Sequence, residues 1–420
     1  MNADSQGWAP DSPSDETAPH KSRGRFFAID QRSWAALMQF GMNAGCAYLV
    51  IAQGTARDNQ RTGWSTNSVM NYAGLGWESA KRSIETLIAK GFIRYGGEHS
   101  AERPRYEIVP FSDLSQLELQ KDPLDFYEES VLNKVRQGSQ PKGKSERSAA
   151  ERLHKRGLII RDEYEGCYSA VPKIEDDPEH LIWFPNSIVL GTQKGEESPV
   201  KRLRRAGDIW ALRLFVDLYH AHNLRDEGGI NRHVIWTKYE RHRAGEQGAY
   251  VVWGFERKEP WLRLVGPFAT HTIRTKPEGK DHPSWETIHL LQSLRLLSFV
   301  PHLFENDTEE AQPVHTFGVG GISEAPIEQE IAAAADAAGR AMCLEGQVQR
   351  LEDLNGCEHF CPVINTLPKV QMIGIGRLTY RPHTKRTGSW FAELKSSGPD
   401  WIRHYKELSE KASRASRRTA

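Results

Sequence analysis

The chain has 420 residues, which is enough for two or three domains, and 38% of them are hydrophobic, which excludes a globally disordered protein. Its 55 basic and 55 acidic residues cancel, so any nucleic-acid surface must come from basic residues gathered locally. Five scattered cysteines argue against a secreted disulfide framework and favour a reducing cytoplasm. No apolar run is long enough to cross a membrane, and the first residues lack the features of a signal peptide.

Composition predicts an α+β protein, mainly helical, that is divided into segments. We expect a disordered arm at 1–25, a first globular block at 26–110, an acidic helix and basic linker at 111–163, a second domain at 164–306, a helix and β-hairpin region at 314–408 and a basic tail at 409–420. The polar residues between the last two blocks, Asp307–Pro313, indicate a loop.

In the first block, a short strand precedes a helix through Ala44, Tyr48 and Ile51. The next helix is expected at Thr66–Tyr72, where Ser65 can cap it. After the tight turn AGLG, a longer helix is expected from Trp77 to Lys90, ended by glycine. Its predicted buried stripe consists of Ala80, Ile84, Leu87 and Ile88.

Two alternating runs close this block, Phe92–Tyr95 and Arg105–Val109, and they predict a β-hairpin. Helix, helix, turn, helix and hairpin follow one another in the winged helix-turn-helix order. Over WSTNSVMNYAGLGWESAKRSIETLIAKGFIRY the sequence resembles the winged helix-turn-helix domains of bacterial, phage and plasmid regulators and replication proteins. The resemblance covers about the first quarter of the chain and implies that the Trp77–Lys90 helix enters the major groove of double-stranded DNA.

The resemblance also implies which residues contact DNA. Arg82 is expected to bind guanine and Lys81 to meet a phosphate, while two arginines of the hairpin, the wing, contact the backbone or minor groove. The implied set is Ser79, Lys81, Arg82, Ser83, Thr86, Arg103 and Arg105. Glu78 and Glu85 lie on the same face of the helix as these residues. Acidic side chains repel phosphate more often than they bind cytosine, so the alternative is a block that packs only against protein.

The second domain, at 164–306, repeats this order, with an insert at 237–284. Its later apolar residues, Leu291, Leu294, Phe299 and Val300, have the spacing of Ile84, Leu87, Phe92 and Ile93. This spacing predicts a second winged helix with β-hairpin insertions. The alternative is a helical domain for dimerisation or partner docking, because the polar face of the later helix is scarcely basic.

Basic runs also gather in this half, at 201–205, at 236–243 and at 377–386. The last lies between two strand-like runs and contains no acidic residue, so it predicts a hairpin that grips the DNA backbone. Its expected contacts are Arg377, Arg381, Lys385 and Arg386. Taken singly, each basic run is more simply a solvated surface.

Three sequence patterns bear on metal binding or catalysis. Cys343, Cys357, His359 and Cys361 are residue types that bind zinc, but no CxxC spacing is present, and ordinary loop residues are the simpler interpretation. His220 and His222, with Tyr405 as a nucleophile, would make a remote nuclease hypothesis. No phosphate-binding GxxxxGK[ST] loop occurs. We therefore expect no enzyme, no catalytic residues, no metal and no cofactor.

These expectations combine into a non-catalytic, double-stranded-DNA-binding protein of a mobile element, similar to replication initiators. The alternatives are a transcriptional regulator, or a nucleic-acid-contacting subunit of a larger defence or transposition complex. A homodimer or partner subunits remain open. We expect a cytoplasmic, bacterial protein with no membrane association.

Overall fold

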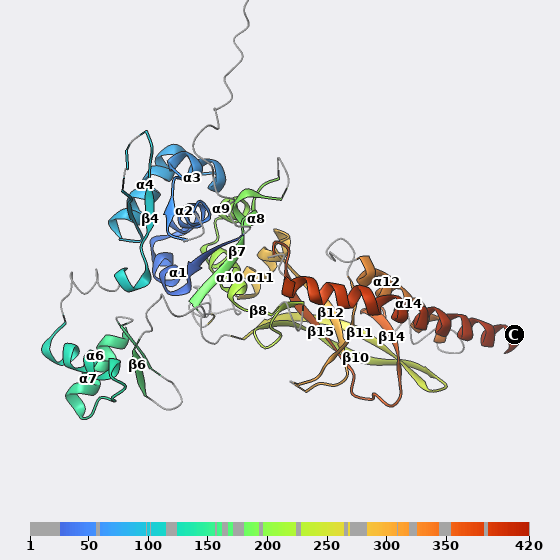
Figure 1. Ribbon diagram of the computed structural model, residues 1–420. Coiled ribbons are helices and arrows are strands. Elements are labelled where there is room, and N and C mark those ends of the chain that lie inside the picture. The colour runs from blue at the N-terminus through green and yellow to red at the C-terminus, as the bar shows by residue number, and fades with distance from the viewer. Residues whose placement is uncertain are drawn as a thin grey trace, which may run out of the picture.

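The structure is a computed structural model, and it describes most of the chain after residue 25. The described residues are 26–55, 59–97, 99–100, 102–114, 124–155, 158–161, 167–170, 180–192, 196–223, 228–263, 268, 284–308, 310–318, 326–343, 354–381 and 385–419. The expected arm at 1–25 lies outside them. The fold is mixed α+β, about half helical, with a six-stranded antiparallel sheet bent into a half-barrel (Figure 1). None of the described helices is long and apolar enough to cross a membrane.

The first block contains four α-helices and a short 3-10 helix. They are α1 (Gln31–Leu37), η1 (Met38–Phe40), α2 (Met42–Gln53), α3 (Thr66–Ala73) and α4 (Trp77–Ala89). Ser65 forms a capping box with Ser68 at the start of α3. Gly74 ends α3 with φ of 66° and ψ of 32°, a left-handed conformation that glycine adopts without strain. The two helices expected around the AGLG turn are therefore confirmed.

Three short strands complete this block as an antiparallel sheet in the order β2-β4-β3. They are β2 (Arg61–Thr62), β3 (Ile93–Tyr95) and β4 (Tyr106–Ile108). The expected hairpin after α4 is confirmed, because Ile93 pairs with Ile108 and Tyr95 with Tyr106.

The first block is joined to the second by a strand pair. β1 (Phe26–Asp30) lies antiparallel to β7 (Leu181–Pro185), and their middle residues, Ala28 and Trp183, face each other. All five residues of β1 therefore pair with the five residues of β7, without an overhang at either end. One hydrophobic core runs through both blocks, from α2 to α10 (Ile209–His220). The expected boundary at Pro110 is thus crossed by both the ladder and the core.

The second block contains further short elements around α10. These are α8 (Ser187–Leu190), α9 (Pro199–Ala206), β8 (His222–Asn223), β9 (Gly229–Ile230) and α11 (Ser284–Ser293). Ser198 caps α9 and Asp208 caps α10 through their side-chain oxygens. α11 leads into strand β12 (Leu297–Phe304) as α4 leads into β3.

The turns after α4 and α11 have the same hydrogen bonds. The closing bonds are Phe92 N to Leu87 O and Leu296 N to Leu291 O, each 2.9 Å. The left-handed position of the first turn is Gly91, with φ of 79°, and that of the second is Arg295, with φ of 55°. The same bond follows the helices that end at Arg136 and Lys155, from Ser139 N to Lys134 O and from Leu158 N to Leu153 O, so it marks a common helix ending. By this turn Leu291 corresponds to Leu87, and not to Ile84 as the apolar spacing predicts.

The expected insert at 237–284 contributes a long hairpin to the large sheet. The sheet consists of β10 (Ile235–Gln247), β11 (Tyr250–Leu262), β12, β13 (Pro313–Thr316), β14 (Cys357–Ile364) and β15 (Gln371–Leu378), in the order β13-β12-β15-β10-β11-β14. β10 and β11 join through a two-residue turn in which Gly248 has φ of 60°. In this sheet the β10–β11 hairpin lies next to β15, and β15 pairs in turn with β12 of the second block.

Two helices, α12 (Pro326–Met342) and α14 (Lys385–Thr419), pack together along the large sheet (Figure 1). A second core holds them to strands of the sheet. At Gly398 an added Cβ would lie 2.4 Å from an Ile327 side-chain carbon, so a glycine is required for this close approach. The helix expected within the region at 314–408 is confirmed as α12. The basic tail expected at 409–420 is instead the end of α14, through Thr419.

A small unit follows the first block. It contains α6 (Phe126–Arg136), α7 (Lys144–Lys155), β5 (Ile159–Arg161) and β6 (Tyr168–Ala170), with a core of its own. The prediction of a linker is wrong here, because α7 buries Ala149, Ala150 and Leu153 against this core. These three apolar residues, at helical spacing, anchor the helix in the core, although the rest of the segment has the composition of a linker.

Candidate nucleic-acid interface

Helix α4 has one buried face and one exposed face. Ala80, Ile84 and Leu87 are buried and pack in the core that includes α2. Lys81 and Arg82 are exposed, and neither forms an ion pair with any described residue. Glu78 and Glu85 are exposed on the same helix. The exposed face therefore offers two free cations and two carboxylates.

The hydroxyl side chains of α4 differ from the expectation. Ser83 is only 5% exposed, and its Oγ donates to the Ser79 carbonyl at 2.7 Å. The prediction of Ser83 as a DNA contact is wrong, because its hydroxyl is turned back on its own helix. Thr86 also donates to its helix, to the Arg82 carbonyl at 2.8 Å, but stays half-exposed, as does Ser79.

The loop between β3 and β4 is held by its own backbone. Gly96 N donates to Arg105 O at 2.9 Å, and Arg103 N donates to Ser100 Oγ at 2.9 Å. The side chains of Arg103 and Arg105 are exposed and have no ion-pair partner among the described residues. Arg94 is less available, because its Nε lies 3.0 Å from a Glu107 carboxylate oxygen.

The arginines expected in a C-terminal hairpin are buried. Arg377 is 2% exposed and its guanidinium contacts both carboxylate oxygens of Glu328, at 2.9 and 3.1 Å. Arg381 is also buried, with its guanidinium carbon 3.8 Å from the Phe391 ring centroid. The prediction of Arg377 and Arg381 as DNA contacts is therefore wrong.

The hairpin itself is also wrong. β15 pairs with β10 and β12, and the segment where the second strand of the hairpin was expected is helix α14. Lys385 and Arg386 begin this helix, and their side chains lie outside the described ones. A run of basic residues between two apolar runs can mark either a hairpin tip or a junction between a strand and a helix. Here it lies between strand β15 and helix α14.

Tyr405, the nucleophile of the nuclease hypothesis, is part of the C-terminal core. Tyr405 is buried in α14, where its hydroxyl lies 2.6 Å from His315 Nε2 and 3.4 Å from Cys361 Sγ. Burial raises the pKa of this tyrosine well above its ordinary value, which disfavours the phenolate a nucleophile needs. Tyr405 is a core residue and not an accessible nucleophile.

The cysteines weighed for zinc form no cluster with a histidine among the described residues. Burial raises the pKa of Cys361 to about 12, which keeps the thiol protonated. The described residues do bring Glu240, His242 and Glu256 together on β10 and β11. Lys258 already balances this group, because its Nζ lies 2.9 Å from Glu240 and 2.8 Å from Glu256.

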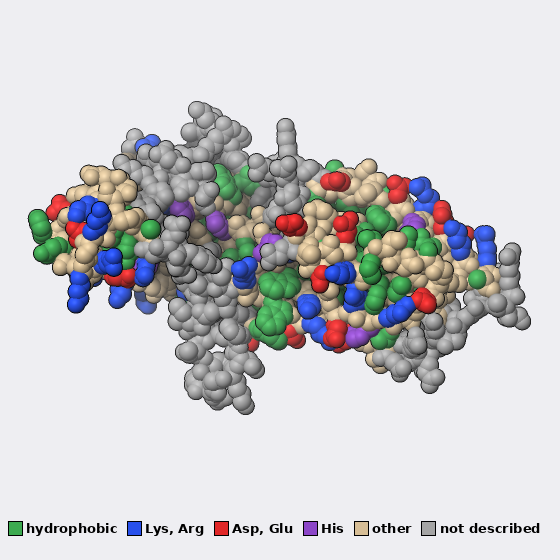
Figure 2. All heavy atoms as spheres, turned by 90° about the horizontal axis from the view of Figure 1, so that it is seen from below, with side chains coloured by type: hydrophobic (Ala, Val, Ile, Leu, Met, Phe, Trp, Pro, Cys, Tyr) green, Lys and Arg blue, Asp and Glu red, His purple; other side chains and the backbone are tan. Residues whose placement is uncertain are grey.

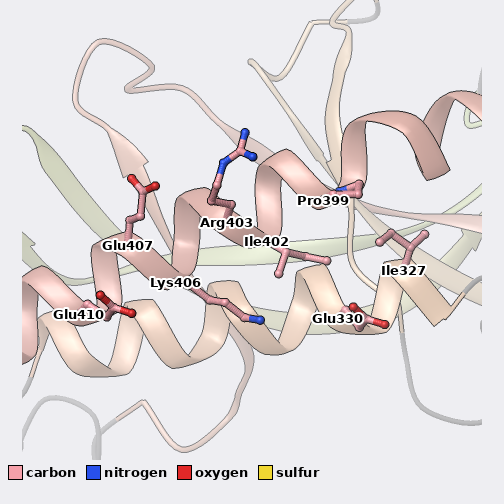
Figure 3. A pocket seen from close by; sticks show the side chains of 8 residues that line it. All are labelled: Ile327, Glu330, Pro399, Ile402, Arg403, Lys406, Glu407 and Glu410. Atoms are coloured by element: carbon pink, nitrogen blue, oxygen red, sulfur yellow. The ribbon is translucent and has the colours of Figure 1, made fainter.

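A groove of about 430 Å³ lies between α12 and α14 (Figure 3). Its lining residues are Ile327, Glu330, Pro399, Ile402, Arg403, Lys406, Glu407 and Glu410. Glu330 comes from α12, whereas α14 supplies two cations and two carboxylates, and the lining contains no cysteine, histidine or serine. Such a lining offers charges of both signs and no nucleophile, as expected of a solvated seam between two helices.

A smaller cavity of about 210 Å³ lies in the first block, where α3, α4 and the β3–β4 loop meet. Its aromatic lining residues are Trp77 and Tyr106, with the His99 ring beside them. None of these three residues is among the predicted DNA contacts, although an exposed tryptophan at the first position of a helix is a signal of a binding surface. The cavity shows that the loop between β3 and β4 borders the start of α4.

Charges of both signs are mixed over the face of the molecule in Figure 2, particularly over the C-terminal half. This distribution agrees with the zero net charge of the whole chain. Attraction of DNA would therefore depend on a few placed cations. None of the protein-family models, curated proteins and solved structures with which the chain was compared matches it.

Proposed function

We propose that the chain binds double-stranded DNA, without catalysis, through a winged helix-turn-helix formed by residues 26–110. In this proposal α3 and α4 are the helix pair, with the left-handed Gly74 between them, and β3 and β4 form the wing. The order of helices and strands supports the proposal, as does the burial of one face of α4.

The observation that carries the proposal is a set of exposed cations on α4 and on the loop after β3, none of which has an ion-pair partner among the described residues. Lys81 and Arg82 lie on the exposed face of α4, and Arg103 and Arg105 lie in the loop that borders the start of the same helix. A protruding helix flanked by a cationic loop matches the width of a major groove and the phosphates beside it.

Each residue then has a proposed task. Arg82 would bind a guanine edge through its two-pronged guanidinium, and Lys81 would meet a phosphate as a point charge. Arg103 and Arg105 would contact the backbone or the minor groove. Ser79 and Thr86 would add lighter contacts, since both side chains are half-exposed.

An initiator-like protein is preferred to a single-module regulator because a second helix-and-strand unit, α11 and β12, shares one hydrophobic core with the first block. On α11, however, the exposed residues include Glu286 and His289, the latter 3.1 Å from Glu259. The second unit therefore suits a second copy or a partner subunit better than phosphate.

The test is fluorescence anisotropy with a labelled duplex that the full chain has selected from a random pool. The double variant Arg82→Ala, Arg103→Ala is expected to weaken binding at least tenfold, since each good base contact contributes about 1–3 kcal/mol. The matched control is Lys238→Ala, Arg257→Ala, which removes two exposed cations from the large sheet. Equal loss in both variants, or none in either, would reject the interface.

A further inference from the structure

The cavity of about 210 Å³ in the first block has an aromatic wall. Trp77 is the first residue of α4, is 50% exposed and lines the cavity. The buried Tyr106 lines the cavity from β4, and the His99 ring lies 5.4 Å from it between ring centroids. Flat aromatic faces such as these are the surfaces on which unpaired nucleobases stack.

The wall is held in place before any ligand arrives. His99 Nδ1 lies 3.0 Å from Arg105 N and 2.9 Å from Arg105 O, so the backbone engages this ring nitrogen and leaves Nε2 for a ligand. Tyr95 also packs on His99, with 4.4 Å between ring centroids, and lies 6.0 Å from the Tyr106 ring. Burial raises the pKa of Tyr106, which keeps its hydroxyl a hydrogen-bond donor.

The polar residues of the cavity decide which ligand suits it. Thr66, Asn67, Ser100 and Glu102 are polar lining residues, and among the described residues of the lining Glu102 carries the carboxylate. A carboxylate repels a phosphate but accepts hydrogen bonds from an amino group, as it does from cytosine N4. Asn67 offers both a donor and an acceptor, as the edge of a base requires.

We infer that this cavity binds one unstacked nucleobase that carries an exocyclic amino group, such as cytosine, presented by the DNA that α4 holds. The base would stack on Trp77, and its amino group would donate to Glu102. Bases inside a duplex are stacked on both sides, so the ligand is an extruded or bulged base. The inference rests on the proposed function, because DNA on α4 would bring the base to the cavity.

The experiment compares three labelled DNAs of one sequence with the full chain by fluorescence anisotropy: a perfect duplex, the duplex with one bulged cytosine, and the duplex with one bulged thymine. The bulged cytosine is expected to bind at least about fivefold more tightly than the perfect duplex, from one stacked base. Trp77→Ala is expected to reduce that ratio to about one, and Trp77→Phe to restore part of it. Glu102→Gln is expected to abolish the preference for cytosine over thymine.

Trp183→Ala is the matched control, because Trp183 is 48% exposed on β7 and outside the cavity, and it should leave the ratio unchanged. Tight binding of the perfect duplex with no gain from either bulge would overturn the base site and leave the proposed DNA binding intact. Binding of the bulged cytosine alone, dependent on Trp77, would instead overturn duplex recognition. If no DNA is bound, both fail.

Discussion

Arg377 of β15 and Glu328 of α12 form a buried ion pair, with guanidinium-to-carboxylate distances of 2.9 and 3.1 Å. Arg377 Nε also donates to the Gly228 carbonyl at 3.0 Å, so the arginine ties α12 to two parts of the sheet region. With both side chains at most 2% exposed, neither charge has water as a substitute partner.

Arg377→Ala is therefore expected to lower the free energy of unfolding by about 3–5 kcal/mol, because it leaves the Glu328 carboxylate buried and unpaired. The double variant Arg377→Met, Glu328→Gln should be less destabilised than the single one. Urea unfolding followed by circular dichroism measures both. If Arg377→Ala is as stable as the wild type, the ion pair is not formed, and Arg377 becomes a candidate DNA contact again.

The β1–β7 ladder predicts that the first block depends on the second for its stability. Phe27 and Phe184 stack in this ladder with ring centroids 5.3 Å apart, and both are buried. Phe184→Ala should cost about 3–5 kcal/mol and speed hydrogen exchange in β1. Trp183→Ala, one residue away on the exposed side, is the control and should cost much less. Unchanged exchange in β1 would contradict the shared core.

Acid is expected to destabilise the C-terminal core through His315. Burial, as the largest cause, lowers the pKa of this histidine to about 3, against an ordinary value of 6.5. The native state thus binds fewer protons than the unfolded state, and stability present above about pH 6.5 is lost as pH falls toward 3. His315→Gln should flatten the dependence of the unfolding free energy on pH in this window.

The exposed His289→Gln is the control for that experiment. The neutral His315 ring can accept the Tyr405 hydroxyl hydrogen bond of 2.6 Å, so Tyr405→Phe should destabilise the protein at neutral pH. A pH dependence that is as steep in His315→Gln as in the wild type would contradict this assignment.

The two carboxylates on the exposed face of α4 should oppose DNA binding. Glu78→Gln, Glu85→Gln removes two negative charges from the proposed interface, and duplex affinity should rise several-fold at low salt. Glu393→Gln, Glu407→Gln changes the charge equally on α14 and is the control. A fall in affinity would show that one of the α4 carboxylates reads a base, for example cytosine N4.

The local elements of the first block could be predicted because their signals are local. Ser65, Gly74 and Gly91 mark helix ends, and the apolar stripe of α4 has a helical period. The large sheet could not be predicted, because β15 pairs with β10 and β12, far away in sequence. α14 was missed because Gly398 and Pro399 normally break a helix, whereas here Gly398 permits close packing on α12.

The candidate site divides in the same way. Lys81, Arg82, Arg103 and Arg105 are exposed as the sequence predicts, because helical period and loop position decide exposure locally. Arg377 looks the same in sequence, yet its partner, Glu328, lies on an element 49 residues away. Charge patterns alone do not distinguish an exposed cation from one that is paired with a buried carboxylate.

The salt dependence of duplex binding tests the central claim most directly. If Arg103 and Arg105 each neutralise a phosphate, the slope of log affinity against log salt should become shallower by about 0.9 for each arginine replaced by alanine. The double variant should therefore lose about 1.8 from the slope, whereas Lys238→Ala, Arg257→Ala should leave it unchanged. A slope that is the same in the wild type and in Arg103→Ala, Arg105→Ala would contradict DNA binding by this wing.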